Sequence, residues 1–132
     1  MRPFFYLIAS LFIMLHCHGE QSVIDSLMSA GKRLHNEDKV NKLINLSREY
    51  FVMGDTNSRR YSREAISLAK KIGFKEGQGK AYLFLGLSFN QNQLDNADND
   101  SALKFYKLSS KILSEINHPW AGFGYENGGS LM

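Results

Sequence analysis

The sequence predicts an all-α fold of antiparallel helix pairs, and three observations lead to this prediction. Two stretches share one pattern of apolar and small side chains, displaced by 44 residues. The steps between their members fit the 3.6-residue period of a helix and not the two-residue period of a strand. Polar turns separate the helical stretches, and no segment has a convincing strand pattern. The first stretch comprises Ser58, Tyr61, Ser62, Ala65, Leu68, Ala69 and Ile72, and the second comprises Ala102, Phe105, Tyr106, Ser109, Ile112, Leu113 and Ile116.

A fixed displacement between two helical faces is typical of a repeat architecture. In such folds each helical unit buries its apolar face against the next unit. With 132 residues, the chain has room for one domain of this kind.

The first 19 residues have the features of a secretory signal peptide. Arg2 provides a positive start, and residues 4–17 form an apolar run that only Ser10 and His16 interrupt. Fourteen helical residues span about 21 Å, which is less than the roughly 30 Å of a bilayer core. Cys17 and Gly19 are small residues at the −3 and −1 positions for cleavage before Glu20. We therefore expect an exported protein, periplasmic or secreted, although a buried helix or an uncleaved anchor would have a similar pattern.

The remaining composition excludes several classes of function. After cleavage the chain would have no cysteine, so apolar packing and not disulfide bonds would have to stabilise it. The formal net charge of +3 for the whole chain is too small to indicate binding to nucleic acid or to an anionic membrane surface. No later segment approaches 18 consecutive apolar residues, so we expect no membrane contact beyond the signal peptide.

The elements follow in order along residues 20–132. An N-terminal helix and linker cover 20–37, with a short helix from Ser22 that ends near Gly31. Asn36 or Asp38 then caps a helix that continues to Tyr50. Residues 54–56 form a turn and a new cap, and the first repeated stretch follows.

The second half has the same organisation. Gly73 ends the preceding helix, and Gly77 and Gly79 allow a tight entry to the next one. Residues 82–89 are apolar on nearly every side, which suits a helix packed between neighbours. A polar segment over 90–100 leads to the second repeated stretch. Pro119 fits the first turn of a further helix, with Asn117 or His118 as its cap.

Residues 82–89 resemble the first helix of a tetratricopeptide repeat. The family pattern has a bulky aromatic residue, then Leu-Gly, then an aromatic residue, and here Tyr82, Leu85-Gly86 and Phe89 occupy these positions. The resemblance extends over 38–132 and implies a tetratricopeptide-like α-solenoid of about two and a half repeats. It recurs in Ala102, Tyr106 and Ser109, in Leu46, Ser47 and Tyr50, in Ser58, Ser62 and Ala65, and in Tyr125 and Gly129.

The repeat is longer than the standard unit of about 34 residues. We place the excess in a linker over 73–78 and in a loop over 90–100. Longer units with the sequences at 69–73 and 75–77 look like the exported sensor arrays of bacterial signalling proteins. This resemblance implies the sensing or interaction part of a signalling protein, because such arrays often precede an output domain.

In a tetratricopeptide array the first helices build the concave side, which implies a groove for a protein or peptide segment. Its mixture of apolar and amide groups suits an extended peptide or a partner helix. An equal alternative is that Leu83 and Leu87 only cover the core. The groove positions are Asn41, Ile44, Arg48, Lys80, Leu83, Leu87, Asn90, Phe123 and Glu126.

One acidic segment has the spacing of a calcium loop. Asn96, Asp98 and Asp100 match, but Ser101 replaces the required Gly, and Lys107 replaces the bidentate Glu. We interpret the segment as a solvated loop that caps the next helix.

The glycine-rich segment 77–80 resembles a phosphate-binding loop. Neither a Walker motif nor a dinucleotide fingerprint is complete, because Phe74, Ala81 and Tyr82 occupy their required positions. We interpret it as a helix terminus followed by a flexible entry.

Metal binding and catalysis have little support. His35 and His118 lie far apart in sequence, and we expect surface or capping roles for both. Without a serine elbow or a mature cysteine, we expect no enzyme activity, no cofactor and no metal.

Two basic stripes remain, and an acidic partner could bind them. We interpret both as solvated helix backs. They comprise Lys104, Lys107 and Lys111, and Arg59 and Arg63.

The glycine-rich end weakens a last helix, so we expect the final ten residues to be ordered only by a partner or a second copy. The alternative to peptide recognition is therefore a structural module that forms homo-oligomers through its C-terminal end.

Overall fold

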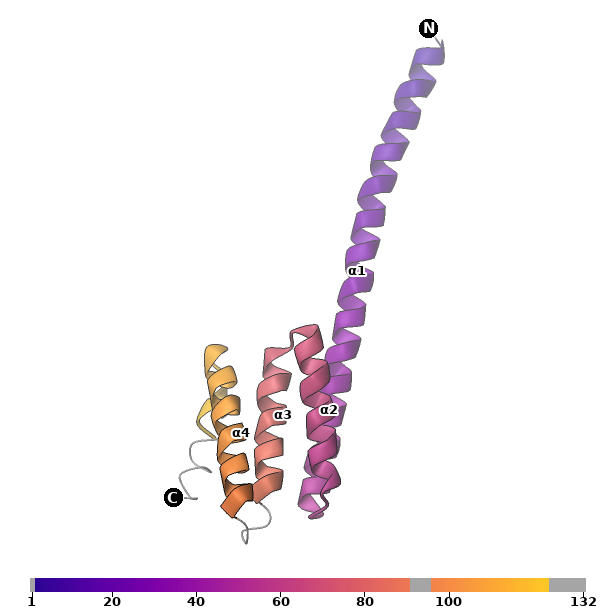
Figure 1. The fold of residues 1–132 in the computed structure, drawn as a ribbon. Helices are drawn as coiled ribbons and strands as arrows, with labels where there is room; N and C mark the ends of the chain where they lie inside the picture. Colours follow the sequence, from indigo (N-terminus) through magenta and orange to yellow (C-terminus); the bar gives the residue numbers. More distant parts are fainter. Residues whose placement is uncertain (1, 91–95, 124–132) are drawn as a thin grey trace. The chain divides into compact units, whose positions relative to one another are not determined.

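The computed structural model describes residues 2–90 and 96–123, and all the regular elements in these ranges are helical (Figure 1). The all-α prediction is confirmed at this level. The chain divides into two compact units, residues 1–35 and 36–132, and each is described separately. The elements are α1 (Arg2–Val52), α2 (Asn57–Ile72), α3 (Lys75–Asn90), α4 (Asn96–Glu115) and the 3₁₀ helix η1 (Pro119–Gly122).

The first unit is helical throughout its described length. The expected helix end at Gly31 is wrong, and so are the caps expected at Asn36 and Asp38, since all three lie inside α1. A glycine ends a helix when it adopts a positive φ, as Gly54 and Gly73 do, and Gly31 does not. In a helix interior it costs only about 1 kcal/mol relative to alanine. No helix of the described residues is both long and apolar enough to cross a membrane.

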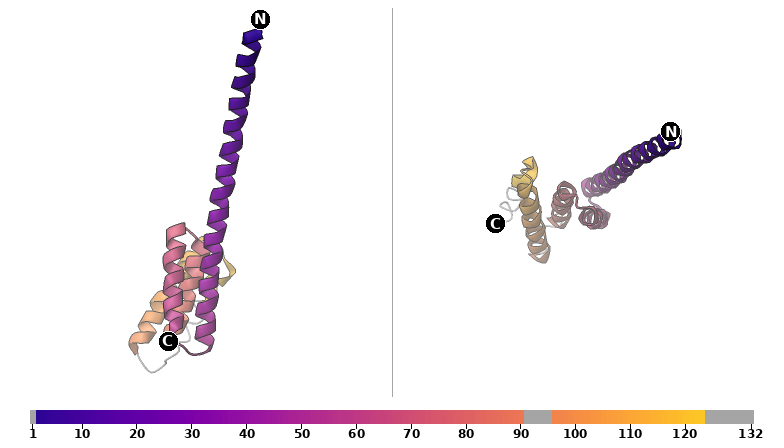
Figure 2. Two further views of the ribbon diagram at one scale, coloured as in Figure 1. Left: turned by 90° about the vertical axis from the view of Figure 1, so that its right-hand side faces the viewer. Right: turned by 90° about the horizontal axis from the view of Figure 1, so that it is seen from above.

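In the second unit, residues 36–52 of α1 are followed by α2, α3 and α4, which lie side by side in this order (Figures 1 and 2). The turn before α2 is capped by Asp55, whose carboxylate accepts a hydrogen bond of 2.8 Å from the Asn57 amide. Thr56 makes no side-chain cap. The predicted helix end at Gly73 is confirmed: its φ is 70°, and the Phe74 amide reaches the Ala69 carbonyl at 2.8 Å.

The connection between α2 and α3 is shorter than expected. The linker predicted over 73–78 is wrong, because α3 begins at Lys75 and only two residues join the helices. Gly77 and Gly79 are buried inside α3. A Cβ atom on Gly79 would lie 2.5 Å from Leu113, and one on Gly77 would lie 2.6 Å from Phe74. These glycines therefore permit close packing and are not a flexible entry.

The two repeated stretches are buried in matching ways. Ser58, Ser62, Ala65 and Ala69 are buried on α2, and their counterparts 44 residues later are buried on α4. Leu68 and Ile112 are partly buried and pack on the same core cluster. The last pair differs, because Ile72 is partly buried and Ile116 is exposed.

The position of Phe105 in the repeated stretch predicts a fully buried side chain, but the side chain is half-buried. Its ring lies between two others, with centroid distances of 6.1 Å to Tyr82 and 5.6 Å to Phe89. The aromatic cluster therefore covers the edge of the α3–α4 contact, where one side of Phe105 meets solvent.

The crossing of α3 and α4 depends on Gly86. A Cβ atom there would lie 2.8 Å from the Tyr106 ring and 3.2 Å from the Ala102 carbonyl oxygen. The absence of a side chain makes room for the Tyr106 ring, which is 1% exposed. Burial raises the pKa of the Tyr106 phenol above its usual value.

The C-terminal part of α4 turns into η1. Asn117 has a φ of 52°, and the His118 amide donates to the Leu113 carbonyl at 2.9 Å. His118 then caps η1, as the sequence predicts for this residue or Asn117, because its Nδ1 accepts a hydrogen bond of 3.1 Å from the Trp120 amide. The expected helix is a 3₁₀ turn of four residues. The described range ends at residue 123. The predicted positions Tyr125, Glu126 and Gly129 therefore lie outside it, and so do all but the first of the last ten residues.

Candidate ligand-binding groove

A groove of about 490 Å³ lies between residues 37–48 of α1, the first half of α3, and η1. We call it the main groove. The lining residues from α1 lie three, four or seven positions apart, so their side chains project from the same face of the helix. The lining residues are Glu37, Asn41, Ile44, Asn45, Arg48, Phe74, Glu76, Lys80, Phe84 and Trp120.

A smaller cavity of about 230 Å³ adjoins the main groove, and we call it the apolar pocket. Phe84 and Trp120 line both spaces, so the two are adjacent. All of its lining side chains are apolar: Leu83, Phe84, Leu87, Trp120 and Phe123. A polar groove beside an apolar pocket can hold a peptide backbone in the groove and a large side chain in the pocket.

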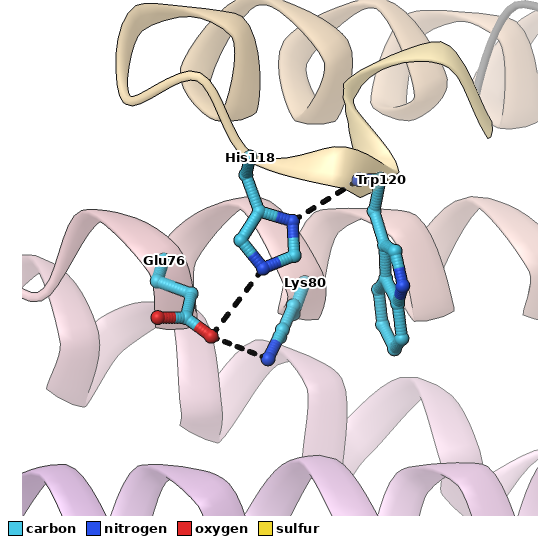
Figure 3. Close-up of polar contacts among 4 residues, drawn as sticks. All are labelled: Glu76, Lys80, His118 and Trp120. Carbon is cyan, nitrogen blue, oxygen red and sulfur yellow. Dashed lines mark hydrogen bonds and ion pairs between the residues drawn. The ribbon is translucent and has the colours of Figure 1, made fainter.

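Trp120 is held over the groove by a small polar cluster (Figure 3). Its ring lies 5.1 Å from Lys80 Nζ and meets the His118 ring edge-on at 5.8 Å. Glu76 accepts a hydrogen bond from Lys80 and lies 3.5 Å from His118 Nε2. These contacts connect α3 to η1 and thereby fix one wall of the groove.

The charge of this cluster is balanced. The hydrogen bond from Lys80 lowers the pKa of Glu76 below its usual value, partial burial opposes this, and the nearby charge of Lys80 and His118 adds to the lowering. Glu76 is therefore ionised near neutral pH and compensates Lys80. Arg48 at the far end of the groove is exposed and lies 3.4 Å from Glu49.

Seven of the nine groove positions predicted from the sequence line these two spaces. Asn41, Ile44, Arg48 and Lys80 line the main groove, and Leu83, Leu87 and Phe123 line the apolar pocket. Ile44 and Leu83 are almost fully buried, so they form the floor. Asn90 lies in neither space, and Glu126 is outside the described residues.

Sequence reasoning missed several lining residues. Asn45, Phe84 and Glu76 lie one helical turn from predicted positions, so the helical period would have found them. Phe74 and Trp120 are different, because they lie in the turn before α3 and in η1, and they reach the groove only through the fold.

Arg59 corrects one prediction about the basic stripes. It is not part of a solvated helix back, because its side chain is 22% exposed and connects three helices. It donates a hydrogen bond of 3.2 Å to the Ser88 carbonyl, lies 4.0 Å from the Phe89 ring centroid, and lies 3.8 Å from Asp98. Lys104, Lys107 and Lys111 are exposed, as predicted.

The remaining motifs also take a place in the packing. Asp98 lies in the first turn of α4, which begins at Asn96 and so makes the expected loop over 90–100 shorter. Segment 77–80 is helical, and Gln78 donates to the Ala69 carbonyl at 3.4 Å. The interpretation of this segment as a flexible entry is therefore wrong. Within the described residues, no three His, Cys, Asp or Glu side chains are grouped to hold a metal ion.

Comparison with protein-family models, with curated proteins and with solved structures finds no match for this chain.

Proposed function

We propose that residues 36–123 form a non-enzymatic, tetratricopeptide-like module that binds a protein or peptide segment in the main groove and the apolar pocket. The observation that carries this proposal is the adjacency of the two spaces, which share Phe84 and Trp120 in their walls. A bound segment would place polar groups beside Asn41, Asn45 and Arg48, and one large apolar side chain in the pocket.

The packing of the helices supports the tetratricopeptide-like part of the proposal. Residues 36–52 and α3 act as first helices, while α2 and α4 act as second helices. A small residue lies at each crossing, namely Ser47 against α2 and Gly86 against α4. This is the role that small residues have in arrays of stacked helix pairs.

The proposed setting is an exported bacterial protein whose module serves as the sensing or interaction part of a signalling system. Its support is the apolar segment 4–17 with its small residues at 17 and 19, together with the resemblance of 69–77 to exported sensor arrays. Mass spectrometry of the chain purified from a bacterial host tests the first step, since cleavage would give a protein that begins at Glu20.

A display library of random peptides, selected on the immobilised chain, tests the binding proposal. We expect enriched peptides to share a large apolar residue and to change the fluorescence of Trp120, which is the only tryptophan in the chain. Arg48→Glu should weaken their binding by roughly tenfold, because a lost charged contact is worth about 1–2 kcal/mol.

Lys107→Glu is the matched control, since it reverses one exposed charge on α4 outside both spaces. It should leave peptide affinity unchanged. The proposal is wrong if no peptide is enriched, or if the enriched peptides bind both variants equally and leave Trp120 emission unaltered.

A further inference from the structure

The first unit presents an apolar face that its own residues do not cover. All the described side chains of this unit, residues 22–35, are exposed. Five of them are large and apolar, with exposed fractions between 48% and 67%. They are Val23, Ile24, Leu27, Met28 and Leu34.

An uncovered face of this size is unusual for a stable helix in water. Residues 22–35 belong to the 51-residue helix α1, but none of their side chains is buried. In most proteins a helix is stabilised by the burial of its apolar face, and exposed apolar clusters mark interaction sites. The apolar face of residues 22–35 is therefore a candidate interaction surface.

The spacing of the face identifies the geometry of that partner. Val23, Leu27, Ala30 and Leu34 follow one another by four, three and four residues. This is the 3.5-residue period of a coiled-coil seam, in which apolar side chains of one helix insert between those of another. Ile24 flanks the seam and widens it.

We propose that residues 22–35 pair with the same segment of a second copy of this chain, through the seam at Val23, Leu27, Ala30 and Leu34. Two identical faces of this kind are self-complementary, as a two-fold interface requires. Met28 lies off this seam, and the other four large side chains leave on the order of 400 Å² per copy, so a pair would bury about 800 Å². That is at the low end of interface sizes, and it fits a weak, reversible dimer.

A membrane surface is a poorer partner for this face. Helices that lie on membranes have a polar face rich in Lys and Arg, with aromatic residues on the apolar face. Residues 22–35 contain no aromatic residue other than His35, and Asp25 partly offsets Lys32 and Arg33. The inference does not depend on the groove, whose lining residues all belong to the second unit.

Sedimentation equilibrium of the purified full chain over a wide concentration range tests the inference. We expect a reversible monomer–dimer equilibrium. The double substitution Leu27→Glu and Leu34→Glu should weaken it by roughly 100-fold, because it places charges in the apolar seam. Ser22→Glu with Ser29→Glu is the matched control, since it adds the same charge to the same helix outside the seam and should leave the dimer unchanged.

Trp120 fluorescence during thermal unfolding establishes that the second unit remains folded in every variant. A loss of helical circular dichroism in the seam variant alone also supports the inference, because pairing then stabilises the helix. A monomer at all concentrations overturns it, and so does a dimer that persists in the seam variant. Flotation with lipid vesicles by a chain that remains monomeric would instead assign the face to a membrane.

Discussion

The second unit contains two helix pairs, residues 36–52 with α2, and α3 with α4. Both pairs bury equivalent positions, but the large and the small side chain at these positions are exchanged between the two helices of a pair. In the first pair, α1 contributes Val40 and α2 contributes Ala69, and both are fully buried. The positions 39 residues after Val40 and 44 residues after Ala69 are Gly79 and Leu113. The large residue has thus moved from the first helix to the second, and a Cβ on Gly79 would clash with Leu113.

The crossing points differ in chemistry as well as size. In the first pair, Ser47 Oγ donates to the Ser58 carbonyl at 2.9 Å and also contacts the Ser62 hydroxyl. In the second pair the corresponding residue is Gly86, and the Tyr106 ring fills the space above it. Where the first pair has a hydrogen-bonded contact between serines, the second pair therefore has an aromatic ring packed against a glycine. The comparison teaches that both crossings keep a small residue on the first helix, whereas the side chains that fill the remaining space differ between the pairs.

The largest expected change in the free energy of unfolding comes from substitutions in the aromatic contacts at the edges of the two pairs. Phe105 stacks with two rings, whereas its counterpart Tyr61 stacks with one ring among the described residues, that of Tyr50, at 5.2 Å. Phe105→Asp should reduce the free energy of unfolding by about 3 kcal/mol, and Tyr61→Asp by about 1 kcal/mol.

Urea unfolding at neutral pH measures both variants. Lys107→Asp, on the exposed side of the same helix as Phe105, is the control and should change the free energy by less than about 0.5 kcal/mol. If Phe105→Asp and Lys107→Asp have equal effects, the assigned faces of α4 are wrong.

A volume swap sharpens the comparison of the two cores. Gly79→Val should destabilise the protein by about 2 kcal/mol, because the new side chain meets Leu113. Leu113→Ala should cost about 3 kcal/mol by leaving a cavity. The double variant restores the total volume and reproduces the Val–Ala arrangement of the first pair.

We therefore expect the double variant to be more stable than the sum of the single effects by at least about 1 kcal/mol, as a double-mutant cycle in urea would measure. Strict additivity would show that the two positions do not share one space. It would remove the basis for comparing the pairs.

The smallest effect concerns the polar cluster, which has no equivalent ion pair in the first pair because Asn41 lies 39 residues before Lys80. The pKa of Glu76 is lowered in the folded state, so its contribution to stability is present above its usual value of 4.5. It is lost as the pH falls through the lowered folded-state pKa. The effect is small because the Glu76 side chain is 40% exposed.

Unfolding free energies at pH 6 and pH 3 test this pH dependence. The native chain should lose more stability over this interval than Glu76→Gln, which cannot ionise. Glu64→Gln, at an exposed site on α2, should behave like the native chain. A similar loss in the native chain and in Glu76→Gln would show that the cluster does not stabilise η1.

Much of the second unit could be predicted from local sequence signals. The faces of α2 and α4 follow from the spacing of their apolar residues, and the helix end at Gly73 follows from the positive φ that glycine tolerates. His118 is a capping candidate because it precedes a proline, and it caps η1. Most of the groove positions come from the resemblance to tetratricopeptide first helices, combined with the helical period.

Other glycines could not be interpreted locally. Gly31, Gly77 and Gly79 have the same local signal as a helix end, yet all three lie inside helices. At Gly77 and Gly79 the decisive fact is a neighbouring side chain from a distant part of the chain. Arg59 is a similar case, since its partners on α3 and α4 are at least 29 residues away.

The sequence by itself determined the helical class, the two equivalent faces and the residues small enough to lie at helix crossings, because these depend on a short period and on side-chain size. The tertiary structure decided which large residue fills each crossing and how Trp120 and Phe74 complete the groove. Such contacts join residues from separate elements, and only their packing brings them within reach of one another.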